Sequence, residues 1–132
     1  MKQVIAYEWA KFLCENAHMQ GFHYLMQYNS RGERVACVMG MLGLLAVKHG
    51  VITQPELHPD SYFADRFKFG DRALGLSGTA SLPDSVVEWA GLKRRDGQYS
   101  EHFTDTLTMA NDAKQVSFEK LADIIGKNWE RL

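Results

Sequence analysis

Hydrophobic positions recur with the helical period in two segments, one near each end of the chain. Between Val4 and Met19, and again between Ser117 and Arg131, apolar residues return at steps of three and four, which places them on one helix face. Ser117 is a residue type that often caps helices. We therefore predict two amphipathic helices, whose apolar stripes are Ile5, Trp9, Phe12, Leu13 and Ala17, and Phe118, Leu121, Ile124, Ile125 and Trp129.

A third helix is predicted from Val35 to His49, and it is apolar nearly all round. That pattern is typical of a buried helix rather than one at the surface. Gly40 and Gly43 each cost about 0.8–1.0 kcal/mol relative to Ala inside a helix. We therefore expect another part of the chain to approach these glycines closely, and we expect Gly50 to end the helix in the left-handed conformation.

The remaining elements are predicted to be short. Phe22–Tyr28 alternates in part and suits a strand that runs into a turn at residues 29–32. From Ile52 to Ala80 the periodicity fades, although aromatic residues persist, which favours one or two short strands or a packed irregular excursion. Ser81 is expected to cap a helix that reaches Ala90, and Gly91 to end it. A helical turn is expected over residues 106–110, ended by an Asn-Asp turn whose side chains bond the backbone.

Together these patterns predict an α+β fold that is mainly helical. The length of 132 residues suits a single compact domain spanning residues 1–132, with a central buried helix and a small β element. Fifteen Lys and Arg against sixteen Asp and Glu give a formal charge of −1. This balance excludes the overall basic character of a protein that coats nucleic acid, although it leaves room for a local basic patch.

The chain carries no segment that predicts a membrane span or a secretory signal. Its longest apolar run, residues 35–47, is shorter than the roughly 20 residues a spanning helix needs. We therefore expect a cytoplasmic protein without membrane contact. Cys14 and Cys37 both lie in apolar segments, and we expect them to be reduced thiols of the core.

Cys37 is the strongest candidate for a nucleophile, because it lies near the positive end of a predicted helix dipole, which can lower the pKa of a thiol. A buried structural cysteine is the competing interpretation, and it is the commoner role of this residue type. The five histidines show no zinc-binding spacing, so neither a metal nor a cofactor is expected. An enzyme or nucleotide-binding module that uses Cys37 and a histidine remains the alternative hypothesis.

The segments Cys37–Gly40, Leu82–Leu92, Leu107–Asp112 and Ser117–Ile125 follow one another in this order. Together they resemble a family of small, mostly uncharacterised proteins of bacteriophages, prophages and other mobile elements. The resemblance covers roughly residues 34–128 and implies a mobile-element context, but it brings no catalytic residues. At Val38 and Gly43 the chain departs from the family, which often has further cysteines there, so a thiolate metal site is not expected.

The leading functional hypothesis is a non-enzymatic accessory protein that binds and inhibits or modulates a host protein or complex, such as a CRISPR–Cas defence complex. Exposed Tyr, Phe and Arg residues supply much of the binding energy at protein interfaces. A weaker alternative is nucleic-acid binding through Lys93–Arg95, a short basic run near aromatic residues. The predicted partner-binding residues are Tyr62, Phe63, Phe67, Phe69, Lys93, Arg94, Arg95, Tyr99 and Phe103.

Overall fold

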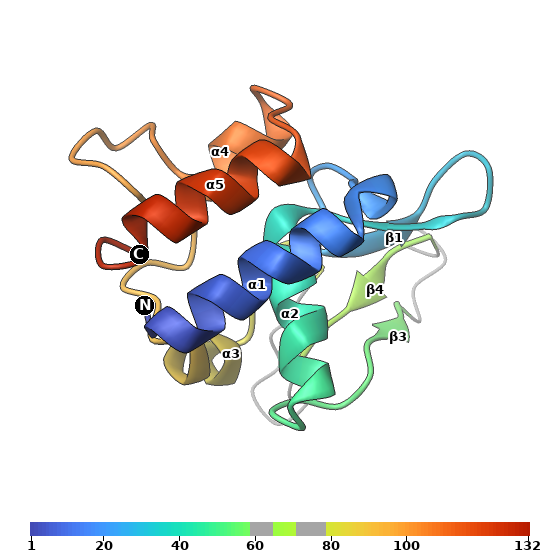
Figure 1. Ribbon diagram of the computed structural model, residues 1–132. Helices are drawn as coiled ribbons and strands as arrows, with labels where there is room; N and C mark the ends of the chain where they lie inside the picture. Colours follow the sequence, from blue (N-terminus) through green and yellow to red (C-terminus); the bar gives the residue numbers. More distant parts are fainter. Residues whose placement is uncertain (59–64, 71–78) are drawn as a thin grey trace.

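The computed structural model describes residues 1–58, 65–70 and 79–132 (Figure 1). Over these residues the fold is α+β and mainly helical, as predicted, with five α-helices and two small antiparallel sheets. None of the helices in this part of the chain is long and apolar enough to cross a membrane. The helices are α1 (Gln3–Glu15), α2 (Val38–Lys48), α3 (Asp84–Ala90), α4 (Leu107–Asp112) and α5 (Phe118–Asn128); the strands are β1 (Met26–Tyr28), β2 (Arg34–Ala36), β3 (Glu56–Leu57) and β4 (Phe67–Lys68).

Helix α2 lies at the centre of the molecule and is buried along most of its length, which confirms the predicted central helix. Helix α1 lies across it, and the Trp9 indole N–H donates to the Val38 carbonyl at 3.2 Å. The predicted start at Val35 is wrong, because residues 34–36 form strand β2 and Cys37 occupies the N-cap. An apolar run has the same appearance in a buried strand and in a buried helix, so the sequence pattern did not separate the two.

The two glycines of α2 lie where other segments approach the helix, as predicted. A Cβ added at Gly40 would lie 1.7 Å from the carbonyl oxygen of Leu25, and one at Gly43 would lie 3.0 Å from the Phe69 ring. Just beyond the end of α2, Gly50 has φ +73°, and the N–H of the next residue donates to the Ala46 carbonyl at 2.9 Å. The helix therefore ends at a left-handed Gly50, as predicted, and the hydrogen bonds there form a Schellman motif.

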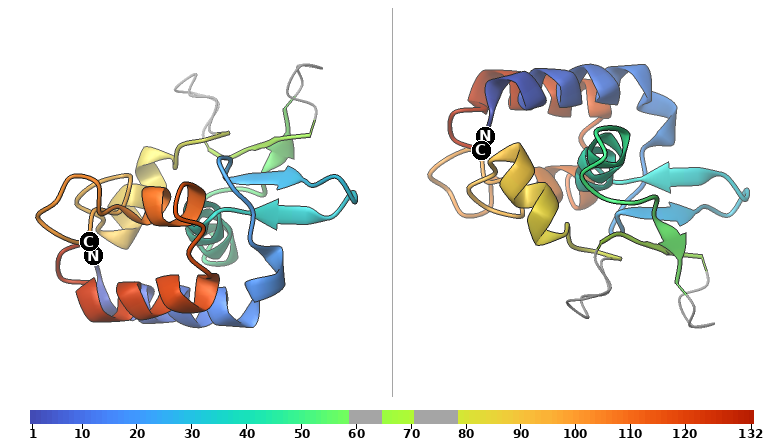
Figure 2. Two further views of the ribbon diagram at one scale, coloured as in Figure 1. Left: turned by 90° about the horizontal axis from the view of Figure 1, so that it is seen from above. Right: turned by 90° about the horizontal axis from the view of Figure 1, so that it is seen from below.

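The first and last helices, α1 and α5, pack antiparallel against each other (Figures 1 and 2). Their fully buried side chains include Trp9 and Leu13 from α1 and Phe118 and Leu121 from α5. Helix α1 is shorter than predicted, because residues 17–19 form a separate 3₁₀ turn. Helix α5 begins as predicted, with the Ser117 hydroxyl accepting the Lys120 N–H at 3.4 Å.

Helix α3 begins later than predicted. Pro83, with φ −60° and ψ 149°, occupies the N-cap position that the sequence pattern assigned to Ser81. The extended ψ of Pro83 keeps the preceding residues out of the helix. The predicted end is confirmed, because Gly91 has φ +70° and the Leu92 N–H donates to the Val87 carbonyl at 3.0 Å.

Strands β1 and β2 form a hairpin that projects from the helical body (Figure 2). Strand β4 pairs with β3, and a bridge between Gln27 and Arg66 joins this second sheet to β1. The excursion after α2 thus contains two of the short strands that the sequence suggested. The predicted turn at residues 29–32 is confirmed, because the Asn29 side chain accepts the N–H groups of Arg31 at 2.9 Å and Glu33 at 3.0 Å.

A buried polar side chain, Asn111, connects segments that are distant in sequence. Its Oδ1 accepts the Val38 N–H at 3.3 Å and its Nδ2 donates to the Gly21 carbonyl at 2.9 Å. The Gln20 Nε2 donates to the Asn111 Oδ1 at 3.1 Å, and the Gln20 Oε1 accepts the Phe118 N–H at 3.1 Å. Asn111 and Asp112 lie inside α4, so the prediction that a turn at these two residues ends the helix is wrong. The Asn111 side chain does bond the backbone, as expected, and with Gln20 it connects the starts of α2 and α5 to the segment that leads into β1.

Candidate functional site

The loop between α3 and α4 carries the most exposed large apolar side chain of the described residues. We call residues 98–106 the Phe103 loop. Its two ends are closed by a bridge between Gln98 and Thr106, and the Tyr99 N–H donates to the Asp105 carbonyl at 3.0 Å. The Thr106 hydroxyl then caps α4 by accepting the Met109 N–H at 3.0 Å. The loop is therefore anchored to a helix at its C-terminal end.

Side chains inside the loop fix its path. The Ser100 hydroxyl donates to the Asp105 carboxylate at 2.7 Å and accepts the His102 N–H at 3.0 Å. The Gln98 amide donates to the Ser100 carbonyl at 2.8 Å. The hydrogen bond from Ser100 lowers the pKa of Asp105, and the Lys114 ammonium, 3.6 Å from the carboxylate, lowers it further. The ionised Asp105 carboxylate thus links the C-terminal side of the loop to Ser100 on its N-terminal side.

Phe103 stands at the outer part of this loop with 82% of its surface exposed, against 72% for Val4, the next most exposed large apolar residue described. Burying such a ring against a partner is worth roughly 1.5–3 kcal/mol. Because the loop backbone is already held by hydrogen bonds, little further ordering would be required on binding. Tyr99 is half-buried and packs against the core, so it supports the loop rather than extending outward. The loop can therefore offer one aromatic anchor to another protein.

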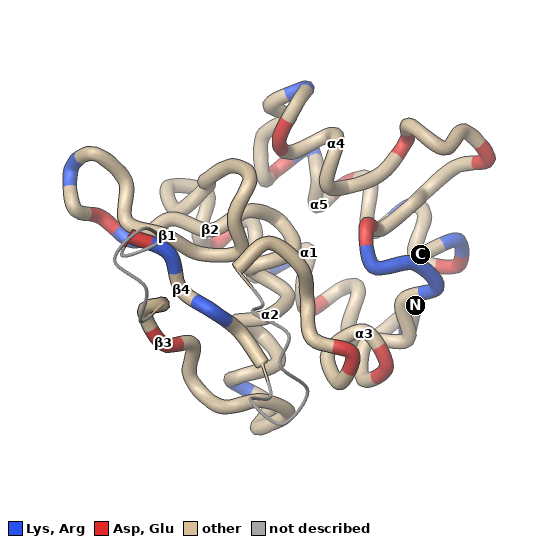
Figure 3. The backbone as a smooth tube through the Cα atoms, turned by 180° about the vertical axis from the view of Figure 1, so that it is seen from behind, with Lys and Arg blue, Asp and Glu red and all other residues tan. Residues whose placement is uncertain are grey.

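The predicted basic turn, Lys93–Arg95, lies close to both chain ends (Figure 3). Each cation in it has a partner within the chain. Lys93 donates to the Glu130 carbonyl, and Arg95 bonds the Leu82 carbonyl and the Asp84 carboxylate. Arg94 pairs with Asp96 through two hydrogen bonds of 2.9 and 3.2 Å, and this contact raises the pKa of Arg94. These bonds fasten α3 and the C-terminal segment, and they do not favour the weaker hypothesis of a nucleic-acid site here.

Two of the predicted contact residues are buried. Phe67 and Phe69 are only 4% and 1% exposed, so the prediction that they form an accessible surface is wrong. The Phe67 ring packs on Tyr28, with ring centroids 5.3 Å apart, and Phe69 covers Gly43. Their spacing of two residues is the period of a strand with one buried face, and this signal identifies them as core residues. Tyr62 and Phe63 lie outside the described residues.

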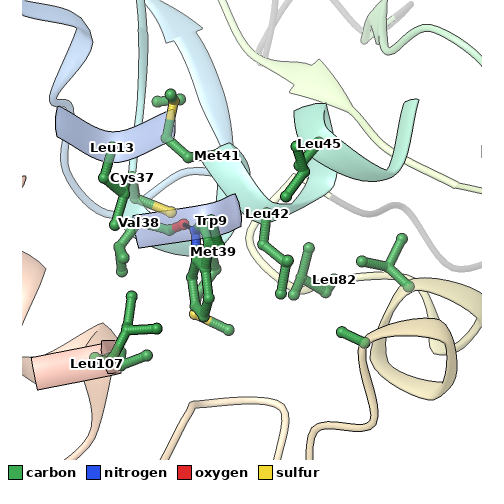
Figure 4. Packing of buried hydrophobic residues seen from close by; sticks show 14 of the residues in the cluster. Trp9, Leu13, Cys37, Val38, Met39, Met41, Leu42, Leu45, Leu82 and Leu107 are labelled. Atoms are coloured by element: carbon green, nitrogen blue, oxygen red, sulfur yellow. Dashed lines mark hydrogen bonds between the residues drawn. The ribbon is translucent and has the colours of Figure 1, made fainter. Parts of the chain in front are cut away.

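Cys37 belongs to the buried cluster around α2 (Figure 4). Burial raises the pKa of its thiol to about 12, against a smaller opposing effect of the Gly40 N–H, which donates to Sγ at 3.4 Å. Desolvation thus outweighs the helix-start effect that made this thiol a candidate nucleophile. Near neutral pH the thiol stays protonated and acts as an N-cap. Cys14 is also a free thiol but it is exposed, so its predicted place in the core is wrong.

One cluster of polar and aromatic side chains was not predicted. His49, at the end of α2, bonds both oxygens of Glu8 from α1 at 2.9 Å, and its ring lies 5.3 Å from that of Trp89 in α3. These contacts join three helices. Because 41 residues separate His49 from Glu8, no local sequence pattern brings them together. In the described part of the chain, no group of three or more His, Cys, Asp or Glu side chains is placed to hold a metal ion.

Comparison with known proteins returned no relative: no family model, no curated protein and no solved structure matches this chain. The resemblance to phage and mobile-element proteins therefore stays a prediction.

Proposed function

We propose that this protein is a non-enzymatic binding protein that docks onto another protein through the Phe103 loop. The observation that carries the proposal is an aromatic ring that is 82% exposed on a loop closed by its own hydrogen bonds. Aromatic side chains supply a large share of the energy at interfaces when they enter a pocket on the partner. An ordered loop that leaves such a ring in water suits this role.

The biological setting that we propose is that of an accessory protein of a bacteriophage or other mobile element. In this setting it acts in the bacterial cytoplasm, where it binds and modulates or inhibits a host protein or complex. Support for the setting comes from the four sequence segments described above. Support for a binding rather than a catalytic role comes from Cys37, the candidate nucleophile, whose thiol is buried and held in the protonated form.

The test compares tagged wild-type protein with Phe103→Ala in capture experiments from a bacterial host lysate, read by quantitative mass spectrometry. Val4→Ala is the matched control, because Val4 is 72% exposed on α1, outside the Phe103 loop. We expect at least one host protein to be captured by wild type and by the control but not by Phe103→Ala. With that partner purified, Phe103→Ala should weaken binding by on the order of 30-fold, which corresponds to a hot spot of about 2 kcal/mol.

The proposal is refuted if Phe103→Ala captures the same proteins as wild type while both variants retain wild-type circular dichroism and melting temperature. A Val4→Ala protein that captures the partner as poorly as Phe103→Ala would also count against it, because the loop would then have no special part in binding.

A further inference from the structure

The β1–β2 hairpin forms an arm at the end of the molecule away from the chain ends (Figure 2). Its tip is stiffened by local bonds. The Asn29 side chain accepts two backbone N–H groups, the Asn29 N–H donates to the Glu33 carbonyl at 2.9 Å, and Gly32 adopts φ +73°. We call residues 26–36 the hairpin arm. Side chains on the arm are thus presented from a fixed backbone.

Two exposed arginines, Arg31 and Arg34, lie on this arm. Among the residues that the structure describes, no carboxylate forms an ion pair with either guanidinium. This distinguishes them from Arg94 and Arg95, whose guanidinium groups are engaged by carboxylates of the chain. The arm also carries one carboxylate, Glu33, so its own formal charge is +1 from two arginines and one glutamate.

Aromatic rings hold two guanidinium groups at this end of the molecule. The guanidinium carbon of Arg34 lies 5.3 Å from the centroid of the Phe67 ring, and that of Arg66 lies 3.8 Å from the centroid of the Tyr24 ring. Asp65 lies 4.0 Å from the Arg66 guanidinium, so this cation is engaged within the chain, and Lys68 adds a further cation on β4. The Phe67 ring beneath the exposed Arg34 guanidinium orients its plane and leaves the N–H groups at its edge for an anion.

We infer that the hairpin arm binds the phosphate backbone of nucleic acid. Planar guanidinium groups match the geometry of phosphate oxygens, and Arg31 in the hairpin turn and Arg34 on β2 place two of them on one arm of the molecule (Figure 3). A projecting two-stranded β-ribbon also has the width that the major groove of a duplex admits. Arg31 at the tip and Arg34, supported by Phe67, are the residues assigned to phosphate contact.

The experiment measures binding by fluorescence anisotropy with two labelled probes, a DNA duplex and an oligouridine, each of about 20 units, which exceeds the usual site size. The test variant is Arg31→Gln with Arg34→Gln. The control is Arg94→Gln with Arg131→Gln, which removes the same charge near the chain ends. At low salt we expect the test variant to bind at least one probe on the order of tenfold more weakly than wild type, and the control to bind within about twofold.

Salt dependence provides a second readout. For each phosphate that the test variant no longer neutralises, the slope of log affinity against log salt should become shallower by about 0.9 on the duplex or about 0.7 on the single strand. The probe that wild type prefers identifies the strandedness of the ligand. The inference is overturned if wild type binds neither probe at low salt, or if the control weakens binding as much as the test variant. It is also overturned if the test variant binds both probes as tightly as wild type does.

Discussion

Replacing Gly40 by Ala should destabilise the protein far more than a single methyl group usually does. The added Cβ would lie 1.7 Å from the Leu25 carbonyl oxygen and 2.5 Å from its carbonyl carbon, and both are backbone atoms. Real Cβ contacts essentially never fall below 3.0 Å, so helix α2 or the Leu25 backbone must move by about 1.3 Å, the difference between 3.0 and 1.7 Å.

That movement is opposed on both sides of the contact. The Leu25 side chain is fully buried and its N–H donates to the Thr79 carbonyl at 2.8 Å, while α2 is buried along most of its length. An extra methylene group in a packed core costs about 1–3 kcal/mol of stability where the neighbouring groups can adjust to it. A displaced backbone in the core places this substitution in the exceptional range, and we expect a loss of at least about 4 kcal/mol. Such a loss approaches the whole stability of a domain, which is about 5–15 kcal/mol.

Urea unfolding followed by circular dichroism measures the effect, with Gly126→Ala as the matched control. Gly126 lies within α5 and nothing lies within 4 Å of its added Cβ, so Ala should stabilise the protein by roughly 0.5–1 kcal/mol. The stability of Gly43→Ala should lie between those of Gly40→Ala and Gly126→Ala, because its added Cβ would lie 3.0 Å from the Phe69 ring, a side chain that can move. A Gly40→Ala protein whose stability lies within about 1 kcal/mol of wild type would refute the reasoning.

Four further outcomes follow from the buried and paired groups. Maleimide at neutral pH should label Cys14 rapidly and Cys37 only after denaturation, read by mass spectrometry; prompt labelling of Cys37 would contradict its burial. The pKa of the Cys37 thiol is about 12 in the folded protein, against an ordinary value of 9.0, so the folded state holds the thiol proton more tightly than the unfolded state does. Stability should therefore fall as pH rises from about 9 to 12, and Cys37→Ala should remove that part of the slope. Asn111→Leu should cost about 3 kcal/mol in urea unfolding, since it leaves the Val38 N–H and the Gly21 carbonyl without their partner; a cost under about 1 kcal/mol would count against this. A double-mutant cycle on Glu8 and His49 should give less than about 1 kcal/mol of coupling, because solvent screens these half-exposed groups.

Local patterns predicted the helices well where neighbouring residues determine them. The stop at Gly91 and the cap at Ser117 depend on residues next to each other in the chain, so their chemistry is visible in the sequence. The start of α2 was misplaced because strand β2 exists only through pairing with β1, a contact between segments that local periodicity does not reveal. Helix α3 has its N-cap at Pro83, two residues after the predicted Ser81. The exact first residue of a helix is hard to predict, because several neighbouring residues can serve as the N-cap.

The candidate site was predicted only in part for a related reason. Phe103 and Phe67 are the same residue type in weakly periodic segments, yet one is 82% and the other 4% exposed. What separates them is tertiary: Phe67 is covered by Tyr28 across a strand contact, whereas the loop around Phe103 is closed by its own polar groups. Exposure of an aromatic residue in an irregular segment depends on contacts that composition does not encode.

The pairing of α1 with α5 has a consequence for how the nascent chain folds on the ribosome. The last residue of α5 follows the last residue of α1 by 113 positions, from Glu15 to Asn128. At a synthesis rate of about 5–20 residues per second, α1 waits roughly 6–23 s for its partner helix to be made. Throughout that interval the apolar stripe around Trp9 and Leu13 lacks its native cover from α5, and it is open to the chaperones that bind bare apolar segments of growing chains.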